Sequence, residues 1–177
     1  MPSLASVPAP ASSRADSEPA SSWVVHGAIA GLLGALVIAV FFLILDLDDG
    51  RPLWTPHALG AWLFRGRVPA PGAPIEPALV LGYTAIHGVV FLGFGLAAAF
   101  EALSGIRRLR HEFTAGLLAA GILFASFELV FVLLGALFTP IVSLLGGGRI
   151  AAANLLAAVA MAGYLARARS RVVARTT

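Results

Sequence analysis

Four long stretches of the chain are almost wholly apolar, and polar segments that contain proline, glycine or arginine separate them. The apolar stretches cover about residues 23–45, 78–103, 112–138 and 149–166. A helix of roughly 20 apolar residues is long enough to cross the hydrocarbon core of a bilayer. The pattern therefore predicts an all-α protein, a bundle of four transmembrane helices over residues 23–166.

The two ends of the chain differ from this apolar part. Residues 1–22 are mostly Pro, Ala and Ser without apolar periodicity, and they cannot bury enough surface to offset the entropy of ordering. We therefore expect a disordered N-terminal tail, and a basic C-terminal tail over residues 167–177. A cleaved signal peptide is the alternative for the first apolar stretch. The length of that stretch, and the acidic sequence DLDDG after it, favour a retained helix.

A further short helix is predicted between the first two apolar stretches. In the sequence TPHALGAWLFRG, Thr55 is a suitable N-cap, Pro56 suits the first turn and Gly66 suits the C-terminal stop. Tryptophan prefers the membrane–water boundary. We therefore expect this helix to lie on the outer surface of the bilayer, with an apolar side formed by Trp54, Leu59, Trp62, Leu63 and Phe64.

Composition also indicates a membrane protein. Hydrophobic residues make up 59% of the chain and charged residues 12%, about half the charge of a soluble domain. The lipid bilayer is therefore the expected partner. The net charge of +3 comes from arginines at the ends of the apolar stretches, so we expect no nucleic-acid binding. The absence of cysteine excludes disulfides and thiolate metal sites.

The 12 arginines are distributed unevenly between the two sides of the predicted bundle. With four crossings, the N-terminus, the middle loop and the C-terminus share one side, which carries eight of them. The positive-inside rule then places both termini in the cytoplasm. All 12 basic residues are arginine and Ala and Gly are abundant, which suggests a GC-rich bacterial genome, so we expect a bacterial inner membrane. Arg107, Arg108 and Arg110 could also bind anionic lipid head groups, although setting the topology is the simpler explanation.

Glu128 is the most unusual residue of the apolar stretches, because a charge at the centre of a membrane helix costs about 2.5–3.5 kcal/mol on insertion scales. It shares a helical stripe with Gly121 and Gly135, and small residues mark the places where membrane helices approach each other. We therefore expect Glu128 to face protein. A short loop joins the second and third stretches, so we expect them to be antiparallel neighbours that pair His87 with Glu128.

The remaining polar residues of the membrane region are expected in the outer half of the bundle. The predicted polar cluster consists of His87, Glu128, Asn154, Tyr83, Asp46 and His57. Three interpretations stay open, namely hydrogen bonds that hold helices together, proton or ion handling, and a metal or cofactor site. Asp46, His57, His87 and Glu128 have ligand-type side chains, but no spacing motif identifies a metal, and no cofactor is predicted.

Glycines in the first apolar stretch predict close helix packing. Gly27 and Gly31 form a GxxxG pattern, and Gly34 follows one turn later. Such a pattern lets two membrane helices approach closely. In a chain this rich in glycine, packing within the bundle is favoured over dimerisation.

A first helix that ends in Asp is followed by the sequence GRPLWTPHALGAWLF and by a helix with YTAIHGVVFLGFG. In this pattern the chain resembles small four-helix bacterial integral membrane proteins of unknown function. The resemblance covers roughly residues 23–166, and it implies the topology but no activity. We expect a non-enzymatic accessory or structural subunit, in a homo-oligomer or a larger membrane complex. The alternatives are proton- or ion-coupled transport through His87 and Glu128, and a metal or redox subunit.

Overall fold

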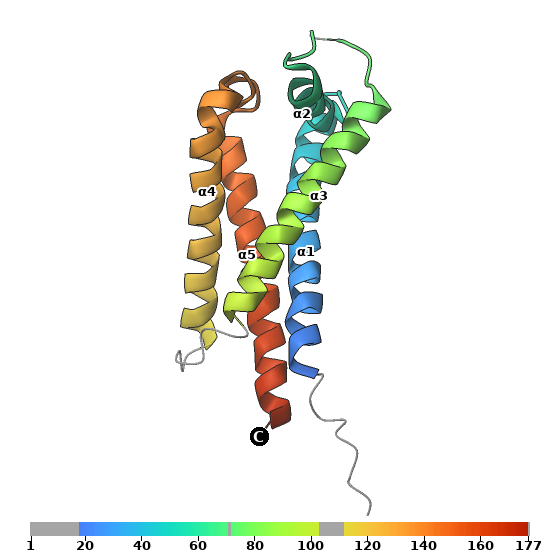
Figure 1. Ribbon diagram of the computed structural model, residues 1–177. Coiled ribbons are helices and arrows are strands. Elements are labelled where there is room, and N and C mark those ends of the chain that lie inside the picture. The colour runs from blue at the N-terminus through green and yellow to red at the C-terminus, as the bar shows by residue number, and fades with distance from the viewer. Residues whose placement is uncertain (1–17, 71, 103–111, 177) are drawn as a thin grey trace, which may run out of the picture.

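A computed structural model describes residues 18–70, 72–102 and 112–176. These residues form the helices α1 (Glu18–Asp48), α2 (Trp54–Arg65), α3 (Pro77–Phe100), α4 (Glu112–Leu145) and α5 (Gly147–Thr176) (Figure 1). Within the described part, four helices are long and apolar enough to cross a membrane, and α2 is the exception. The expected all-α bundle with four membrane spans is confirmed.

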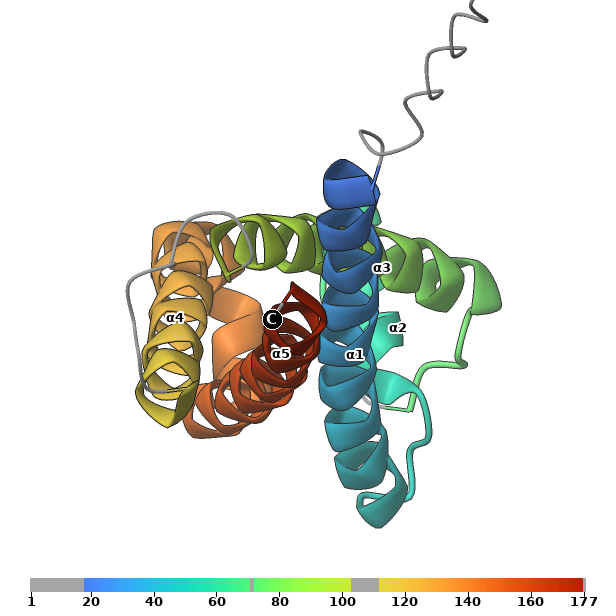
Figure 2. The ribbon, with the colours of Figure 1, turned by 90° about the horizontal axis from the view of Figure 1, so that it is seen from below.

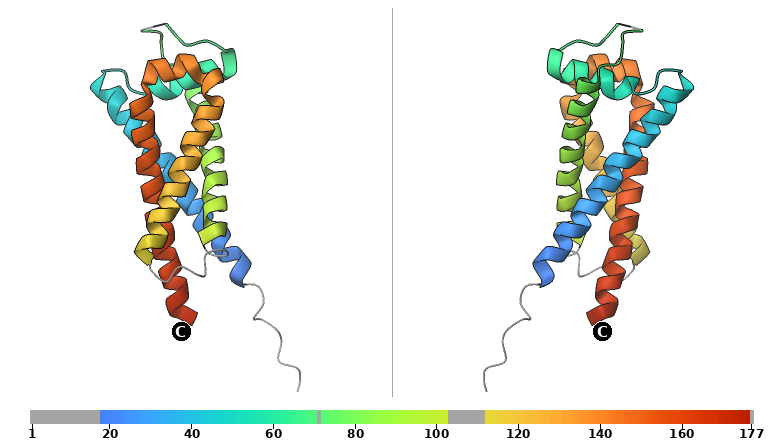
Figure 3. Two further views of the ribbon diagram at one scale, coloured as in Figure 1. Left: turned by 90° about the vertical axis from the view of Figure 1, so that its left-hand side faces the viewer. Right: turned by 90° about the vertical axis from the view of Figure 1, so that its right-hand side faces the viewer.

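The start of α1 and the end of α5 lie at the same end of the bundle (Figures 1 and 3). Helix α2 lies across the opposite end, which we call the α2 end. The chain is therefore a multi-pass membrane protein whose first and last helices begin and finish on one side.

The helices associate in two pairs. Helix α3 packs along α1, helix α4 packs along α5, and α1 also contacts α5. The backbones of α3 and α4 stay apart, and aromatic side chains such as Phe94 and Phe127 bridge them. Seen from below, α3 crosses α1 steeply, while α4 and α5 lie beside each other (Figure 2). The expectation that α3 and α4 are close neighbours is wrong, although they follow each other in the chain.

Glycines explain why α3 packs on α1. A Cβ atom on Gly31 would collide with the backbone of Phe91, and one on Gly95 would collide with the backbone of Gly27. On Gly27, a Cβ would lie 2.8 Å from the Cα atom of Leu96. Lipid chains are as apolar as leucine, so membrane helices associate mainly where their backbones can pack closely. The glycines of α1 and α3 provide such a contact, as the GxxxG pattern led us to expect.

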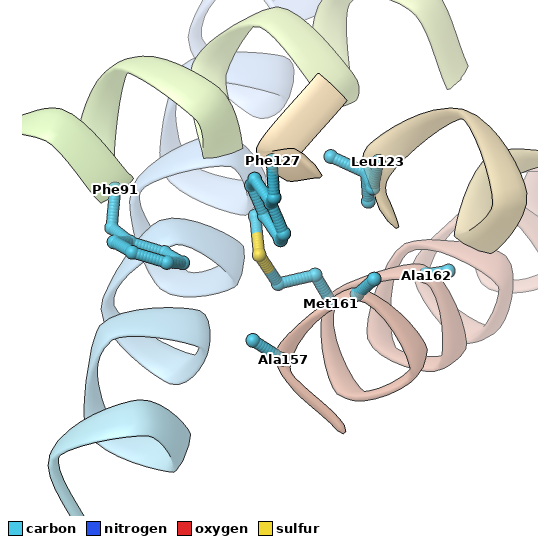
Figure 4. Packing of buried hydrophobic residues seen from close by; sticks show 7 residues of the cluster. Phe91, Leu123, Phe127, Ala157, Met161 and Ala162 are labelled. Carbon is cyan, nitrogen blue, oxygen red and sulfur yellow. The ribbon is translucent and has the colours of Figure 1, made fainter. Parts of the chain in front are cut away.

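The largest group of buried apolar residues joins all four spans. Met161 of α5 is fully buried, and its side chain extends toward Phe127 of α4 and Phe91 of α3, beside Ala157 (Figure 4). Gly34 completes this contact from α1, because a Cβ there would collide with the Met161 sulfur. A smaller group of Ala30, Ala99 and Leu165 joins α1, α3 and α5.

Helix boundaries differ from the expected ones in three places. Helix α1 begins at Glu18, inside the expected tail. Helix α4 continues past residue 138 to Leu145, and this part contains Pro140 and bends across the α2 end (Figure 3). Helix α5 continues to Thr176, so the expected C-terminal tail is helical over residues 167–176. Alanine and arginine favour helix, and cations are favourable near a helix C-terminus. Only Gly146, with a φ of 81°, separates α4 from α5.

We predict that Gly31→Ala destabilises the bundle by about 1–3 kcal/mol, because the added methyl group forces α1 away from α3. Gly93→Ala is the matched control, since nothing lies within 4 Å of a Cβ at that position of α3. Unfolding of both variants in detergent, followed by circular dichroism, measures the difference. Equal stability of the two variants would contradict the close crossing of α1 and α3.

Candidate functional site

A cavity of about 220 Å³ lies among the five helices, in the half of the bundle nearest α2. We call it the central cavity. Its polar lining residues are Tyr83 and His87 of α3 and Asn154 of α5. Among the described residues that line it, none is Asp, Glu, Lys or Arg. The rest of the wall is apolar and consists of aliphatic side chains and five phenylalanines, Phe42, Phe91, Phe94, Phe127 and Phe131.

A second cavity of about 230 Å³ adjoins the first between α1, α2 and α3. We call it the flank cavity. The wall that the two cavities share consists of Ile38, Phe42, Leu59, Tyr83 and His87. Tyr83 and His87 are therefore the polar residues that both cavities have in common.

Aromatic rings form a continuous row along the cavity side of α3. Tyr83, His87 and Phe91 follow at four-residue spacing, which places them above one another on one helix face. The rings of Tyr83 and His87 stack with centroids 5.7 Å apart, and those of His87 and Phe91 are 4.7 Å apart. Phe127 of α4 continues the row, 5.2 Å from Phe91. The predicted polar cluster included Tyr83 and His87 but not the continuation to Phe91, which the same spacing could have revealed.

His87 joins α3 to α1. Its Nε2 atom lies 3.3 Å from the carbonyl oxygen of Ala35. A carbonyl oxygen can only accept a hydrogen bond, so Nε2 carries the hydrogen. In the neutral imidazole, Nδ1 is then the acceptor.

Glu128 joins α4 to α5. The Nδ2 atom of Asn154 donates a hydrogen bond of 2.9 Å to Oε1 of Glu128. Asn154 is buried and Glu128 is half-buried. The predicted pairing of His87 with Glu128 is therefore corrected, because α3 packs on α1 rather than on α4 and each side chain finds a different partner. Glu128 does face protein, as expected, but the protein is α5.

Asp46 fixes the start of α2. The side chain is 4% exposed, its Oδ2 atom accepts a 2.7 Å hydrogen bond from the backbone N–H of Thr55, and its Oδ1 atom accepts one of 2.7 Å from Thr55 Oγ1. The first N–H groups of a helix lack partners within the helix, and the helix dipole favours a carboxylate there. Asp46 thus caps α2 from the end of α1.

This arrangement corrects the expected N-cap. Leu53 occupies that position rather than Thr55, and it has a left-handed φ of 65°. Such a conformation costs roughly 1–3 kcal/mol for a residue with a side chain. The two bonds to Asp46 offset this cost, since hydrogen bonds to a charged group contribute about 1.5–3 kcal/mol each.

The other end of α2 is held by an ion pair. Arg65 binds Glu76 through two parallel hydrogen bonds of 2.6 and 2.5 Å, and the arginine holds the pKa of the Glu76 carboxyl group below its usual value. Glu76 precedes α3, so α2 is tied to both α1 and α3. Gly66 ends α2 as expected, with a left-handed φ of 66°.

The buried side of α2 differs from the expected apolar side. Leu63 and Phe64 are exposed, whereas His57 is 1% exposed and packs edge-on against Trp54. A Cβ on Gly60 would collide with the backbone of Leu79, so small residues bring α2 onto α3. The Nδ1 atom of His57 is buried without a hydrogen-bond partner in the described part of the chain.

The predicted polar cluster is thus divided into separate contacts. Asp46 binds Thr55, and Glu128 binds Asn154. His87 binds the carbonyl oxygen of Ala35, and Tyr83 stacks on its ring. His57 lies on the buried side of α2. Across residues 18–70, 72–102 and 112–176, no three His, Cys, Asp or Glu side chains lie close enough to hold a metal ion.

The predicted helix-packing glycines differ in their surroundings. Gly27, Gly31 and Gly34 lie at close helix contacts, but Gly121 faces open space, so the small stripe beside Glu128 is not a packing surface there. The surroundings of Gly135, together with Arg107, Arg108 and Arg110, lie outside the described residues.

The sequence analysis missed a contact at the end opposite α2. Nδ1 of His26 on α1 lies 2.9 Å from the hydroxyl group of Tyr164 on α5. The two residues are far apart in the chain, and no local pattern connects them.

Comparison with known proteins adds no relative, since no protein family, curated protein or solved structure matches the chain.

We predict a coupling of about 0.5–1.5 kcal/mol between Glu128→Ala and Asn154→Ala in a double-mutant cycle, because the two side chains share a hydrogen bond. Urea- or SDS-induced unfolding of the purified protein measures it. The cycle of Glu128→Ala with His87→Ala is the control and should be additive. Strong coupling in the control, with additivity in the first cycle, would show that Glu128 pairs with α3 instead.

Proposed function

We propose that the protein is a non-enzymatic accessory protein of the bacterial inner membrane, and that it holds a lipid-soluble molecule in the central cavity. The observation that carries the proposal is the cavity itself, which is wide enough for a ligand and lined by phenylalanines with few polar groups. Ligand sites for small apolar molecules typically have this composition, with a few polar side chains that fix orientation.

The position of two valines supports entry from the lipid. Val90 of α3 and Val130 of α4 both line the central cavity, yet they are 46% and 37% exposed. The cavity therefore opens between α3 and α4, the two helices whose backbones stay apart. Both helices are candidate membrane spans, so this opening would face the acyl chains of the bilayer.

The partners of the titratable groups support an accessory role over ion-coupled transport. The transport interpretation needs His87 and Glu128 to exchange a proton or an ion. His87 instead contacts a backbone carbonyl group of α1, and Glu128 contacts an amide of α5. Both contacts join helices, which is the usual role of isolated polar residues in small membrane bundles. Association with a larger membrane complex, or with a second copy, stays a prediction.

Arginine distribution supports an orientation with both termini in the cytoplasm, because eight of the 12 arginines lie on that side. The α2 end and the opening of the central cavity would then lie in the outer half of the membrane. Reporter enzymes that are active on only one side of the membrane, fused to each terminus, test this orientation. Both termini should report the cytoplasm, and a periplasmic signal from either would contradict it.

We predict that Val130→Trp reduces occupancy of the central cavity severalfold, because the larger ring fills the opening. The control is Val132→Trp on the same helix, at a residue that is exposed and does not line the cavity. A small phenyldiazirine photolabel, added to the protein in lipid nanodiscs, measures occupancy through mass spectrometry of the labelled residues. The wild type and the control should carry label on cavity phenylalanines.

The same experiment can contradict the proposal. Leu129 and Leu133 are exposed on α4 and do not line the central cavity, so they report contact of the label with the surrounding lipid. If the label attaches to such residues alone, the cavity holds no lipid-soluble molecule.

A further inference from the structure

We propose that Tyr83 and His87 bind the hydroxyl group of an uncharged lipid alcohol in the central cavity. The inference rests on the proposed function, which requires a lipid-soluble ligand but leaves its polar group open. It adds the chemical identity of that group, the two side chains that recognise it, and the classes of lipid that the site rejects.

His87 offers the ligand a hydrogen-bond acceptor. Nε2 carries the ring hydrogen, because its partner is the carbonyl oxygen of Ala35, so the neutral ring has a free lone pair on Nδ1. No described residue forms a hydrogen bond with this Nδ1 atom. His87 lines both cavities, and a ligand that satisfies its acceptor must bring a donor.

Tyr83 offers a donor on the same face of α3, one turn from His87. Its ring stacks on His87 with centroids 5.7 Å apart, and its hydroxyl group has no hydrogen-bond partner in the described part of the chain. A tyrosine hydroxyl group away from water normally has a partner. A ligand hydroxyl can donate to Nδ1 of His87 and accept from Tyr83 at the same time. An ether or ketone oxygen can only accept, so it would satisfy Tyr83 alone.

The charges around the cavities disfavour an anionic ligand. No described residue that lines either cavity is Arg or Lys. A phosphate or carboxylate placed away from water without a cation is strongly unfavourable. Asp46, the carboxylate that lines the flank cavity, would repel such a group further. Phospholipids and fatty acids are therefore poor ligands for this site, and a neutral alcohol suits it.

The phenylalanines accommodate the hydrocarbon part of the ligand. Tyr83 and His87 lie toward the α2 end, while Phe91, Phe94 and Phe127 lie deeper in the bundle. An engineered cavity of about 150 Å³ binds benzene, so the larger central cavity has room for the first part of a prenyl chain. The rest of the prenyl chain can leave through the opening between Val90 and Val130, so a ligand with a longer prenyl chain fits equally well.

Binding of three farnesyl compounds to the full chain in zwitterionic nanodiscs tests the proposal. Radiolabelled farnesol, farnesyl methyl ether and farnesyl phosphate share one hydrocarbon chain and differ only in the polar group. Farnesol should bind about tenfold more tightly than the ether, because the ether cannot donate to His87. Farnesyl phosphate should bind more weakly than farnesol.

Variants assign this preference to the two side chains. His87→Phe should bind farnesol and the ether equally. Tyr83→Phe keeps the ring and should weaken both by a similar factor, so that the preference for the alcohol is kept. Val89→Ala, at an exposed position of α3 outside both cavities, is the matched control and should resemble the wild type. Tyr83→Phe decides the question if His87→Phe does not fold.

The outcomes separate the inference from the proposed function. Equal binding of farnesol and the ether by the wild type, or unchanged binding of both by Tyr83→Phe, would overturn the hydroxyl site but leave the cavity as a ligand site. Tightest binding of farnesyl phosphate would overturn the exclusion of anions. If no farnesyl compound binds, the inference fails, and the photolabel then shows whether the cavity holds any lipid-soluble molecule.

Discussion

The close backbone contact between α1 and α3 is the constraint on which the rest of the structure depends. In a bilayer, burying apolar side chains against protein gains little, because lipid surrounds them equally well. Helices must therefore associate where their backbones can approach. Gly27 and Gly31 on α1 and Gly95 on α3 allow this at one crossing, where even a methyl group would collide with the facing backbone.

The cavities follow from that contact. Because α3 is committed to α1 and crosses it steeply, it diverges from α4 toward the α2 end, while α4 stays beside α5 (Figures 1 and 2). Aromatic rings fill only part of the space between α3 and α4, and α2 covers the end of that space. Asp46 and the Arg65–Glu76 pair hold α2 in place, so that Leu59 closes both cavities from that side. The polar side chains of the cavity wall then serve two purposes. Nε2 of His87 joins α3 to α1, while Nδ1 of His87 and the hydroxyl group of Tyr83 stay available to a ligand.

Local patterns in the sequence predicted the elements, but partner choice is not local. Apolar length identified the four spans, and Gly66 identified the end of α2, because each depends on neighbouring residues. The partner of Glu128 depends on which helix lies beside α4. A short connection suggested α3, whereas glycine contacts between α1 and α3 decided otherwise. Thr55 was a reasonable N-cap by sequence, yet only the fold could bring the Asp46 carboxylate to the backbone N–H of Thr55. The cavity could not be predicted, because it arises from the angle between helices.

Cysteine cross-linking in native membranes tests the helix arrangement most directly, and the chain has no cysteine of its own to interfere. Ala30→Cys with Ala99→Cys places thiols in the buried contact between α1 and α3. His87→Cys with Glu128→Cys places them on α3 and α4. With a short thiol-reactive cross-linker, the account predicts efficient linkage of the first pair and little of the second. Efficient linkage of the second pair and none of the first would contradict it.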